Sequence, residues 1–241
     1  MRIPRLFVDQ ALTEHSDIQL NDQASHYLSK VLRLKEQSPL IVFNNRGGEY
    51  SAHIDKLNKK SLQLHIGEHQ KLDRLSDLQI HLGIGISKGD RFDWALQKAT
   101  ELGVTSISPL FTERTEIKLK ADRAEKKLAH WRQVTISASE QCQRNRLPNI
   151  HPPQTLDQWL EVTDADKKWV LHHRSPEALS PADKLNSAAL LIGPEGGLSE
   201  EEIAVAIATG FSALSLGPRV LRTETAPIAA ITLLQFHWGD L

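Results

Sequence analysis

The sequence predicts an α/β protein in which a small β-rich part precedes a parallel sheet with helices on both faces. The chain of 241 residues is 40% hydrophobic and 24% charged, which is typical of a globular protein with a buried core. Over the first ~70 residues, apolar residues tend to alternate with polar ones, and this indicates strands. Beyond them, short apolar runs typical of buried strands alternate with segments whose apolar residues recur at helical spacing, and this alternation favours a parallel sheet.

The N-terminal part is predicted to hold strands at residues 5–8, 40–43, 50–57 and 61–66. The loop at 44–48 is rich in Asn and Gly, which tolerate positive φ, so it predicts a hairpin in a small antiparallel sheet or barrel. Asn21 or Asp22 is expected to cap one helix. Its apolar residues recur at helical spacing: Ala24, Tyr27, Leu28, Val31 and Leu32.

The polar stretch at residues 68–77 is the predicted linker region. We place a first domain at 1–70, the linker at 71–77 and a second domain at 78–241. The second domain is predicted to contain strands at 78–86, 104–110, 169–172, 188–192 and 213–216. Helices are predicted at 90–102, which Gly103 ends, and at 122–143, with Trp94 and Trp131 at core-like positions. Two further helices are predicted: one begins at a capping box formed by Ser199–Glu202, and the last begins near Thr223.

Composition excludes several classes of protein. No apolar run approaches the ~18 residues of a membrane span, and the N-terminus lacks the apolar region of a signal peptide. The single cysteine, Cys142, forms no internal disulfide and is assigned to packing, which favours a reducing cytoplasm. The neighbouring His172 and His173 lack a third ligand at metal-binding spacing, so no metal is predicted.

Two glycine-rich loops follow predicted strands of the second domain. The first is GPEGG at 193–197, and the second runs from Gly217 to Ala226 with two arginines and a glutamate beside a helix N-terminus. Neither is a Walker A loop or a G-x-G-x-x-G motif. Ligands of parallel sheets gather at the carboxyl ends of strands, so these loops and the one after Leu171 are the candidate site. Taken singly, each loop could be an ordinary turn, with Thr223 as a helix cap.

Together, the two loops resemble the signature of the small-subunit ribosomal RNA (uracil-N3) methyltransferases of the SPOUT superfamily. Further similar segments lie at 1–7, 26–34, 88–91, 97–104 and 140–148, so the resemblance covers nearly the whole chain. It implies a PUA-like β-barrel RNA-binding domain followed by a trefoil-knot domain that binds S-adenosylmethionine. It also implies a homodimer formed through the C-terminal domain, and a substrate that is 16S rRNA in the assembled 30S subunit. His173, where proline is expected, and Pro227 depart from the family pattern.

The resemblance and the residue types assign roles within the loops. Arg222 is the candidate that stabilises negative charge on uracil or orients the base, and Glu224 is the candidate that accepts the N3 proton or holds Arg222. The roles could be exchanged. Cofactor binding is expected at the following residues: Leu171, His172, Gly193, Pro194, Glu195, Gly196, Gly197, Leu216, Gly217, Arg219, Leu221, Thr223, Thr225 and Ala226.

RNA binding is expected through local basic patches because the formal net charge is −1. Residues 112–151 carry nine Lys or Arg against five Asp or Glu, a local charge of +4, although several of these lysines fit a solvated helix face equally well. The expected RNA contacts are Arg2, Arg5, Arg33, Lys88, Arg91, Arg114, Arg144 and Arg146. The alternatives are another SPOUT reaction, such as 2′-O-ribose methylation of tRNA, and a non-catalytic RNA-binding assembly factor.

Overall fold

The computed structural model describes residues 3–58, 61–117, 121–172, 179 and 184–241, and it divides into two compact units. One unit takes the chain up to Leu75 together with Ser139–Leu147, and the other takes Ser76–Ala138 and the chain from Pro148 onward. The predicted Arg2 and the departure at His173 lie outside the described residues. The domain boundaries inferred from composition treat each domain as one continuous stretch, and they stay a prediction.

The first unit contains one five-stranded sheet in the order β1-β3-β4-β5-β2. Its elements are β1 (Arg5–Phe7), β2 (Asp17–Gln19), α1 (Asp22–His26), η1 (Tyr27–Val31), β3 (Pro39–Phe43), β4 (Glu49–Leu57) and β5 (Leu62–Gln70). The sheet is mixed, because β1 pairs parallel with β3 whereas the other pairs are antiparallel. The expected antiparallel pairing is confirmed for β3, β4 and β5, whereas β1 departs from it, and β5 extends three residues into the polar stretch at 68–77, through Gln70.

The predicted N-terminal helix is shorter than its apolar pattern suggests. Asn21 caps α1 by accepting a hydrogen bond from the Ala24 N–H, but after His26 the backbone changes to the π-helical turn η1. Wider i→i+5 bonding moves residues out of the register that a 3.6-residue period assumes. Leu28 is therefore fully buried, whereas Tyr27 and Val31 are exposed.

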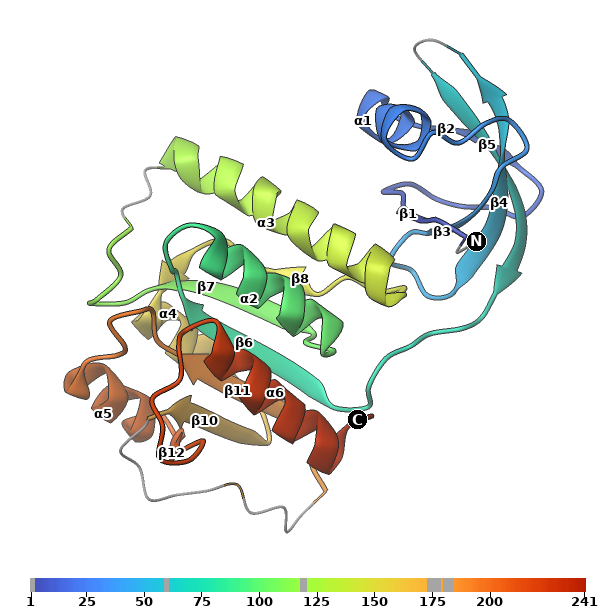
Figure 1. The fold of residues 1–241 in the computed structure, drawn as a ribbon. Coiled ribbons are helices and arrows are strands. Elements are labelled where there is room, and N and C mark those ends of the chain that lie inside the picture. Colours follow the sequence, from blue (N-terminus) through green and yellow to red (C-terminus); the bar gives the residue numbers. More distant parts are fainter. Residues whose placement is uncertain (1–2, 59–60, 118–120, 173–178, 180–183) are drawn as a thin grey trace. The chain divides into compact units, whose positions relative to one another are not determined.

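The second unit is built on a parallel sheet whose main path has the order β12-β10-β11-β6-β7-β8 (Figure 1). Its strands are β6 (Gln79–Gly85), β7 (Ser106–Phe111), β8 (Asn149–Ile150), β9 (Gln154–Thr155), β10 (Lys167–Leu171), β11 (Ser187–Ile192) and β12 (Ser212–Leu214). Its helices are α2 (Asp90–Glu101), α4 (Leu156–Val162), α5 (Glu200–Ala208) and α6 (Thr225–Trp238), and α3 (Ala121–Cys142) belongs to it as far as Ala138. The predicted parallel sheet is confirmed.

Side chains of the central strand β11 alternate between two apolar cores. Leu190 and Ile192 join the core made with α2, α6 and Trp131 of α3, whereas Leu191 joins the core made with α4 and α5. Helices thus cover both faces of the sheet, as Figure 1 shows and as the sequence predicted. Trp94 does not join a core, because it lies on the exposed side of α2 with 42% of its surface accessible.

Local signals set the ends of the helices around the sheet. Ser199 and Glu202 form the predicted reciprocal capping box of α5, and Gly103, at φ +89°, follows α2 as predicted. A second capping box, formed by Thr155 and Gln158, begins α4, which the sequence analysis missed. The alternative in which Thr223 caps the last helix is wrong, because the N-cap of α6 is Glu224.

Candidate active site

A cavity of about 780 Å³ lies at the carboxyl ends of three neighbouring strands of the second unit. The end of β10 and the chain after it contribute Leu171 and His172, the end of β11 and its loop contribute residues 192–198, and the end of β12 and the chain after it contribute most residues from Leu214 to Ala226. The strand predicted at 213–216 extended too far, because β12 ends at Leu214 and Leu216 lines the cavity instead. The three loops that the sequence singled out therefore meet at one place.

Nearly all residues predicted to bind the cofactor line this cavity. Among the described residues in that prediction, Thr225 alone is outside the lining; it is exposed at the start of α6. The lining also includes residues that the sequence analysis did not single out: Ile192, Leu198, Glu200, Ile203, Leu214 and Val220. Glu200 and Ile203 stand three apart on α5, a spacing that places both on one helix face and could have identified them.

The loop after β11 packs so closely on itself that it needs glycine. A Cβ atom added at Gly193 would lie 2.7 Å from both the Gly197 carbonyl carbon and the Leu198 nitrogen. The Gly197 N–H donates to the Pro194 carbonyl over 2.8 Å and closes the turn. Because glycine has no side chain, the main chain at Gly193, Gly196 and Gly197 itself forms part of the cavity wall.

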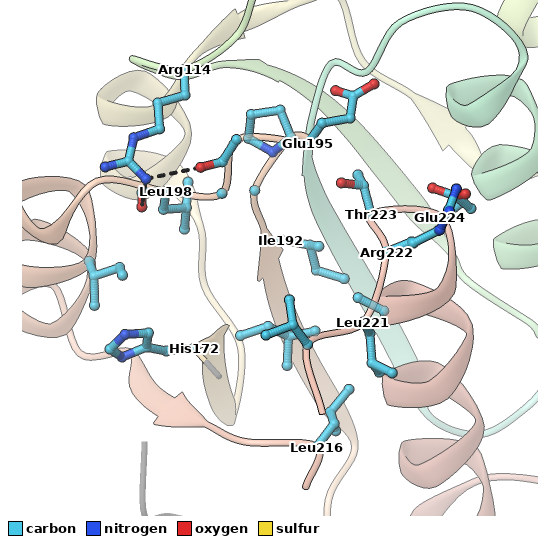
Figure 2. A pocket seen from close by; sticks show the side chains of 18 of the residues that line it. Arg114, His172, Ile192, Glu195, Leu198, Leu216, Leu221, Arg222, Thr223 and Glu224 are labelled. Carbon is cyan, nitrogen blue, oxygen red and sulfur yellow. Dashed lines mark hydrogen bonds between the residues drawn. The ribbon is translucent and has the colours of Figure 1, made fainter. Parts of the chain in front are cut away.

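The cavity suits an amphipathic nucleoside. Its walls include the apolar side chains of Ile192, Leu216 and Leu221 (Figure 2). Leu171 and the glycines of the two loops also line it, and glycine main chain carries N–H and carbonyl groups that can form hydrogen bonds. A volume of this size is within the range of pockets that bury a small-molecule ligand. The residues present therefore fit S-adenosylmethionine, whose adenine and ribose need apolar walls with a few polar contacts.

Two candidate catalytic residues stand on the segment that leads into α6. Arg222 and Glu224 both line the cavity, on either side of Thr223 (Figure 2). The Arg222 carbonyl accepts hydrogen bonds from the N–H groups of Thr225 and Ala226, each over 2.9 Å, which fixes the start of the helix. The Arg222 side chain is exposed, so its guanidinium is accessible to a substrate.

Two of the predicted RNA contacts are buried in the first unit. The Arg5 guanidinium donates to Glu49 over 2.7 Å and to the Asn145 amide oxygen, and the Arg5 residue is 7% exposed. Arg144 is 5% exposed. Such burial does not allow either guanidinium to contact a phosphate, so we correct both assignments to structural roles. Arg33 and Arg146 are both exposed, and Arg146 lies beside Asp73, with 3.4 Å between the Arg146 Nε and the carboxylate.

The remaining predicted RNA contacts lie in the second unit. Arg91 and Arg114 line the cavity, and Lys88 is exposed and paired with Glu116. No group of three or more His, Cys, Asp or Glu side chains in the described ranges is arranged to hold a metal ion. None of the helices in that same part of the chain is long and apolar enough to cross a membrane.

Comparison with known families matches both units. A family model described as an RNA methyltransferase domain matches residues 74–235, and one described as an RNA methyltransferase PUA domain matches residues 20–67. A ribosomal RNA small subunit methyltransferase E from Buchnera aphidicola is 40% identical over 100% of this chain and 98% of its own length. The protein of the same name from Bacillus subtilis is 28% identical over 97% of this chain and 96% of its own length.

Solved structures agree with these matches. A ribosomal RNA small subunit methyltransferase E from Neisseria gonorrhoeae, bound to S-adenosylmethionine, is 35% identical with a TM-score of 0.92, and all of both chains is covered. A Legionella pneumophila protein solved with the same bound cofactor is 38% identical with a TM-score of 0.97, again over all of both chains.

Proposed function

The chain belongs to the ribosomal RNA small subunit methyltransferase E family, and from this premise we propose that it methylates N3 of one uridine in 16S rRNA. It is an S-adenosylmethionine-dependent enzyme, since its full-length relatives are named as ribosomal RNA small subunit methyltransferases and two of its structural relatives hold the cofactor. The observation that carries the finer proposal is the meeting of three strand-end loops at one cavity, with Arg222 and Glu224 on its wall.

S-adenosylmethionine, when bound, supplies an electrophilic methyl carbon on a sulfonium. The glycine-rich loops after β11 and β12 would hold its nucleoside part against main chain, with Leu171, Leu216 and Leu221 as apolar walls. These contacts fix position, which is the main contribution a protein can make to an in-line displacement.

The uracil imide needs help because N3 is a poor nucleophile while it carries its proton. We assign Glu224 as the acceptor of that proton and Arg222 as the cation that stabilises the negative charge left on O2 and O4. The N3–methyl bond then forms as the sulfur–methyl bond breaks, so the positive charge on sulfur is neutralised and the sulfur leaves as a thioether. Both side chains lie on the segment that leads into α6, so its backbone positions them together.

The assembled 30S subunit is the proposed substrate, and the cytoplasm is the proposed location. We further propose the knotted threading of the C-terminal segment that the family resemblance implies, and a homodimer formed through α6. That helix carries no Asp, Glu, Lys or Arg, and it leaves Leu233 and Phe236 exposed by 38% and 67%. An uncharged helix with exposed large apolar side chains favours a protein partner.

Mass spectrometry of nucleosides tests the proposed reaction. The protein is incubated with S-adenosylmethionine and 30S subunits that lack the modification, and the 16S rRNA is then digested. We expect one N3-methyluridine per subunit. A methyl group on ribose would favour the alternative SPOUT reaction. If no methyl group is transferred and calorimetric titration shows no cofactor binding, the non-catalytic assembly factor is supported instead.

A further inference from the structure

Arg114 reaches the glycine-rich loop from the chain that follows β7. Its Nη1 donates to the carbonyl oxygen of Gly196 over 2.9 Å and approaches that of Leu198 at 3.3 Å (Figure 2). A short turn holds the arginine in place, because the Thr112 N–H donates to the Thr115 hydroxyl and the Thr115 N–H donates to the Thr112 carbonyl, each over 3.0 Å. The guanidinium is therefore already engaged with main chain of the cavity wall.

The stem of Arg114 also packs against this loop. A Cβ atom added at Gly196 would lie 3.0 Å from the Arg114 Cβ, a separation tighter than ordinary contact. The neighbouring Glu113 N–H donates to Glu202 over 2.8 Å, and Glu202 belongs to the capping box of α5. The segment after β7 is thus attached both to the loop and to the helix that follows the loop.

Glu195 attaches the same loop on another side. Its carboxylate accepts the Lys88 N–H over 2.9 Å and lies 3.5 Å from the Arg91 guanidinium. These groups stand at the start of α2, whose N-cap Gly89 has no side chain to accept a hydrogen bond. A carboxylate near a helix N-terminus is favoured by the unpaired N–H groups there. The loop is therefore connected to the segments that follow β6 and β7.

From these contacts we infer that Arg114 is a positioning residue for the cofactor loop, and that it does not act as a phosphate contact. It holds the carbonyls of Gly196 and Leu198 so that the main chain of residues 193–198 keeps the shape that receives S-adenosylmethionine. Arginine suits this position because its planar fork carries several fixed donors, whereas lysine offers one compact ammonium group. The inference rests on the proposed function, since it assigns the loop to cofactor binding.

Steady-state kinetics of Arg114→Met and Arg114→Lys test the inference. We expect the Michaelis constant for S-adenosylmethionine to rise about tenfold in Arg114→Met, because charge-assisted hydrogen bonds to the loop are lost. Arg114→Lys should recover part of this loss, while the Michaelis constant for 30S subunits stays within about twofold of wild type in both variants. Lys167→Met is the matched control, because Lys167 is exposed at the opposite end of β10 from the cavity.

The outcomes separate the two roles. A raised Michaelis constant for 30S subunits with unchanged cofactor affinity would overturn the inference in favour of an RNA contact. Unchanged constants for both substrates would overturn it as well, and so would parallel losses in both. Calorimetric titration of the wild-type protein with S-adenosylmethionine separates this inference from the proposed function. A wild type that does not bind the cofactor would contradict the proposed function itself. A wild type that binds the cofactor and an Arg114→Met variant that binds it equally well would contradict the inference alone.

Discussion

The guanidinium of Arg5 lies 2.7 Å from the carboxylate of Glu49, and their side chains are 4% and 5% exposed. The Arg5 guanidinium also lies over the Phe43 ring, 5.3 Å from its centroid, while the half-exposed Arg74 donates to the same Glu49 oxygen over 3.1 Å. An arginine that the sequence suggests for RNA binding is therefore part of the interior of the first unit. Burial raises the pKa of Glu49, but the hydrogen bonds from Arg5 and Arg74 outweigh it and leave the pKa below its usual range.

Removal of one partner of this pair is expected to destabilise the protein strongly. Arg5→Met leaves the buried Glu49 carboxylate with Arg74 alone, and we expect a loss of about 3 kcal/mol in the free energy of unfolding. Urea denaturation followed by circular dichroism measures it. In the double variant Arg5→Met/Glu49→Leu the loss should be smaller, because no carboxylate is left buried. A double variant whose loss equals the sum of the two single losses would contradict this account.

Glu140 predicts a pH dependence of the opposite sign to that of Glu49. Burial raises the pKa of Glu140, although the Phe7 N–H, which donates to it over 2.9 Å, and the charge of Arg5 both act to lower it. A raised pKa in the folded protein means that the contribution to stability is complete below the unfolded value of about 4.3 and is lost as the pH rises through the folded value.

The variant Glu140→Gln tests this sign. It keeps an oxygen that can accept the Phe7 N–H but carries no charge, so its stability relative to wild type should increase as the pH rises from about 4 to about 7. Urea midpoints across that range measure the difference. Glu125→Gln, on the exposed side of the same helix, is the control and should follow the wild-type curve. A Glu140→Gln curve parallel to wild type would show that the carboxyl group gains no such shift on folding.

Gly193→Ala is expected to weaken S-adenosylmethionine binding by at least about tenfold, because its methyl group would meet main chain that cannot move without reshaping the loop. Calorimetric titration measures the affinity. Gly210→Ala is the matched control. Gly210 has a positive φ, +92°, so alanine strains its backbone, but the nearest neighbour of the added methyl group would be the flexible end of Lys168, and Gly210 is not among the residues that line the cavity. Equal losses of affinity in the two variants would attribute the effect to general backbone strain.

Arg222→Ala should lower kcat for methyl transfer by about 10²- to 10³-fold while cofactor affinity stays near wild type, because the charge on uracil develops only as the reaction proceeds. Glu224→Gln should lower kcat as well and should remove a pH dependence of the rate if the carboxylate accepts the proton. Single-turnover assays with labelled cofactor separate chemistry from binding. Full-rate methylation by Arg222→Ala would reject its assigned role.

Phe236→Asp is expected to shift a homodimer toward monomers, because it places a charge on an apolar face of α6 that is proposed to be covered. Sedimentation velocity over a range of protein concentrations measures the shift. Val162→Asp, which changes an apolar side chain that is 74% exposed at the end of α4, is the control. A wild-type chain that sediments as a monomer at all concentrations would contradict the proposed dimer.

The parts of the fold that depend on neighbouring residues could be predicted from the sequence. The capping box at Ser199 and Glu202 and the glycine after α2 depend on contacts three or four residues apart, so both appear in the sequence as spacing. The loops at the strand ends were identifiable for the same reason, because glycine and proline mark sharp turns locally. The Thr155–Gln158 box that begins α4 has an equally local signal, and it was overlooked.

The fate of individual charges could not be predicted in this way. Arg5 is buried by Glu49, 44 residues away, and by Asn145, 140 residues away, and no local pattern indicates either contact. Arg114 likewise donates to carbonyls more than 80 residues further along the chain. Basic residues on a stretch of positive charge have the same appearance in sequence whether they bind phosphate, a buried carboxylate or main chain.

The division of the chain has a practical consequence for anyone who isolates the N-terminal module. A fragment that stops at Leu75 omits Ser139–Leu147, which supplies the Glu140 acceptor for the Phe7 N–H and the Leu147 N–H that Asn45 accepts over 2.7 Å. Such a truncation would leave the Phe7 N–H and the Asn45 side-chain oxygen without these partners. A fragment that keeps these hydrogen bonds needs the nine residues Ser139–Leu147 joined to residues 1–75 through a designed linker.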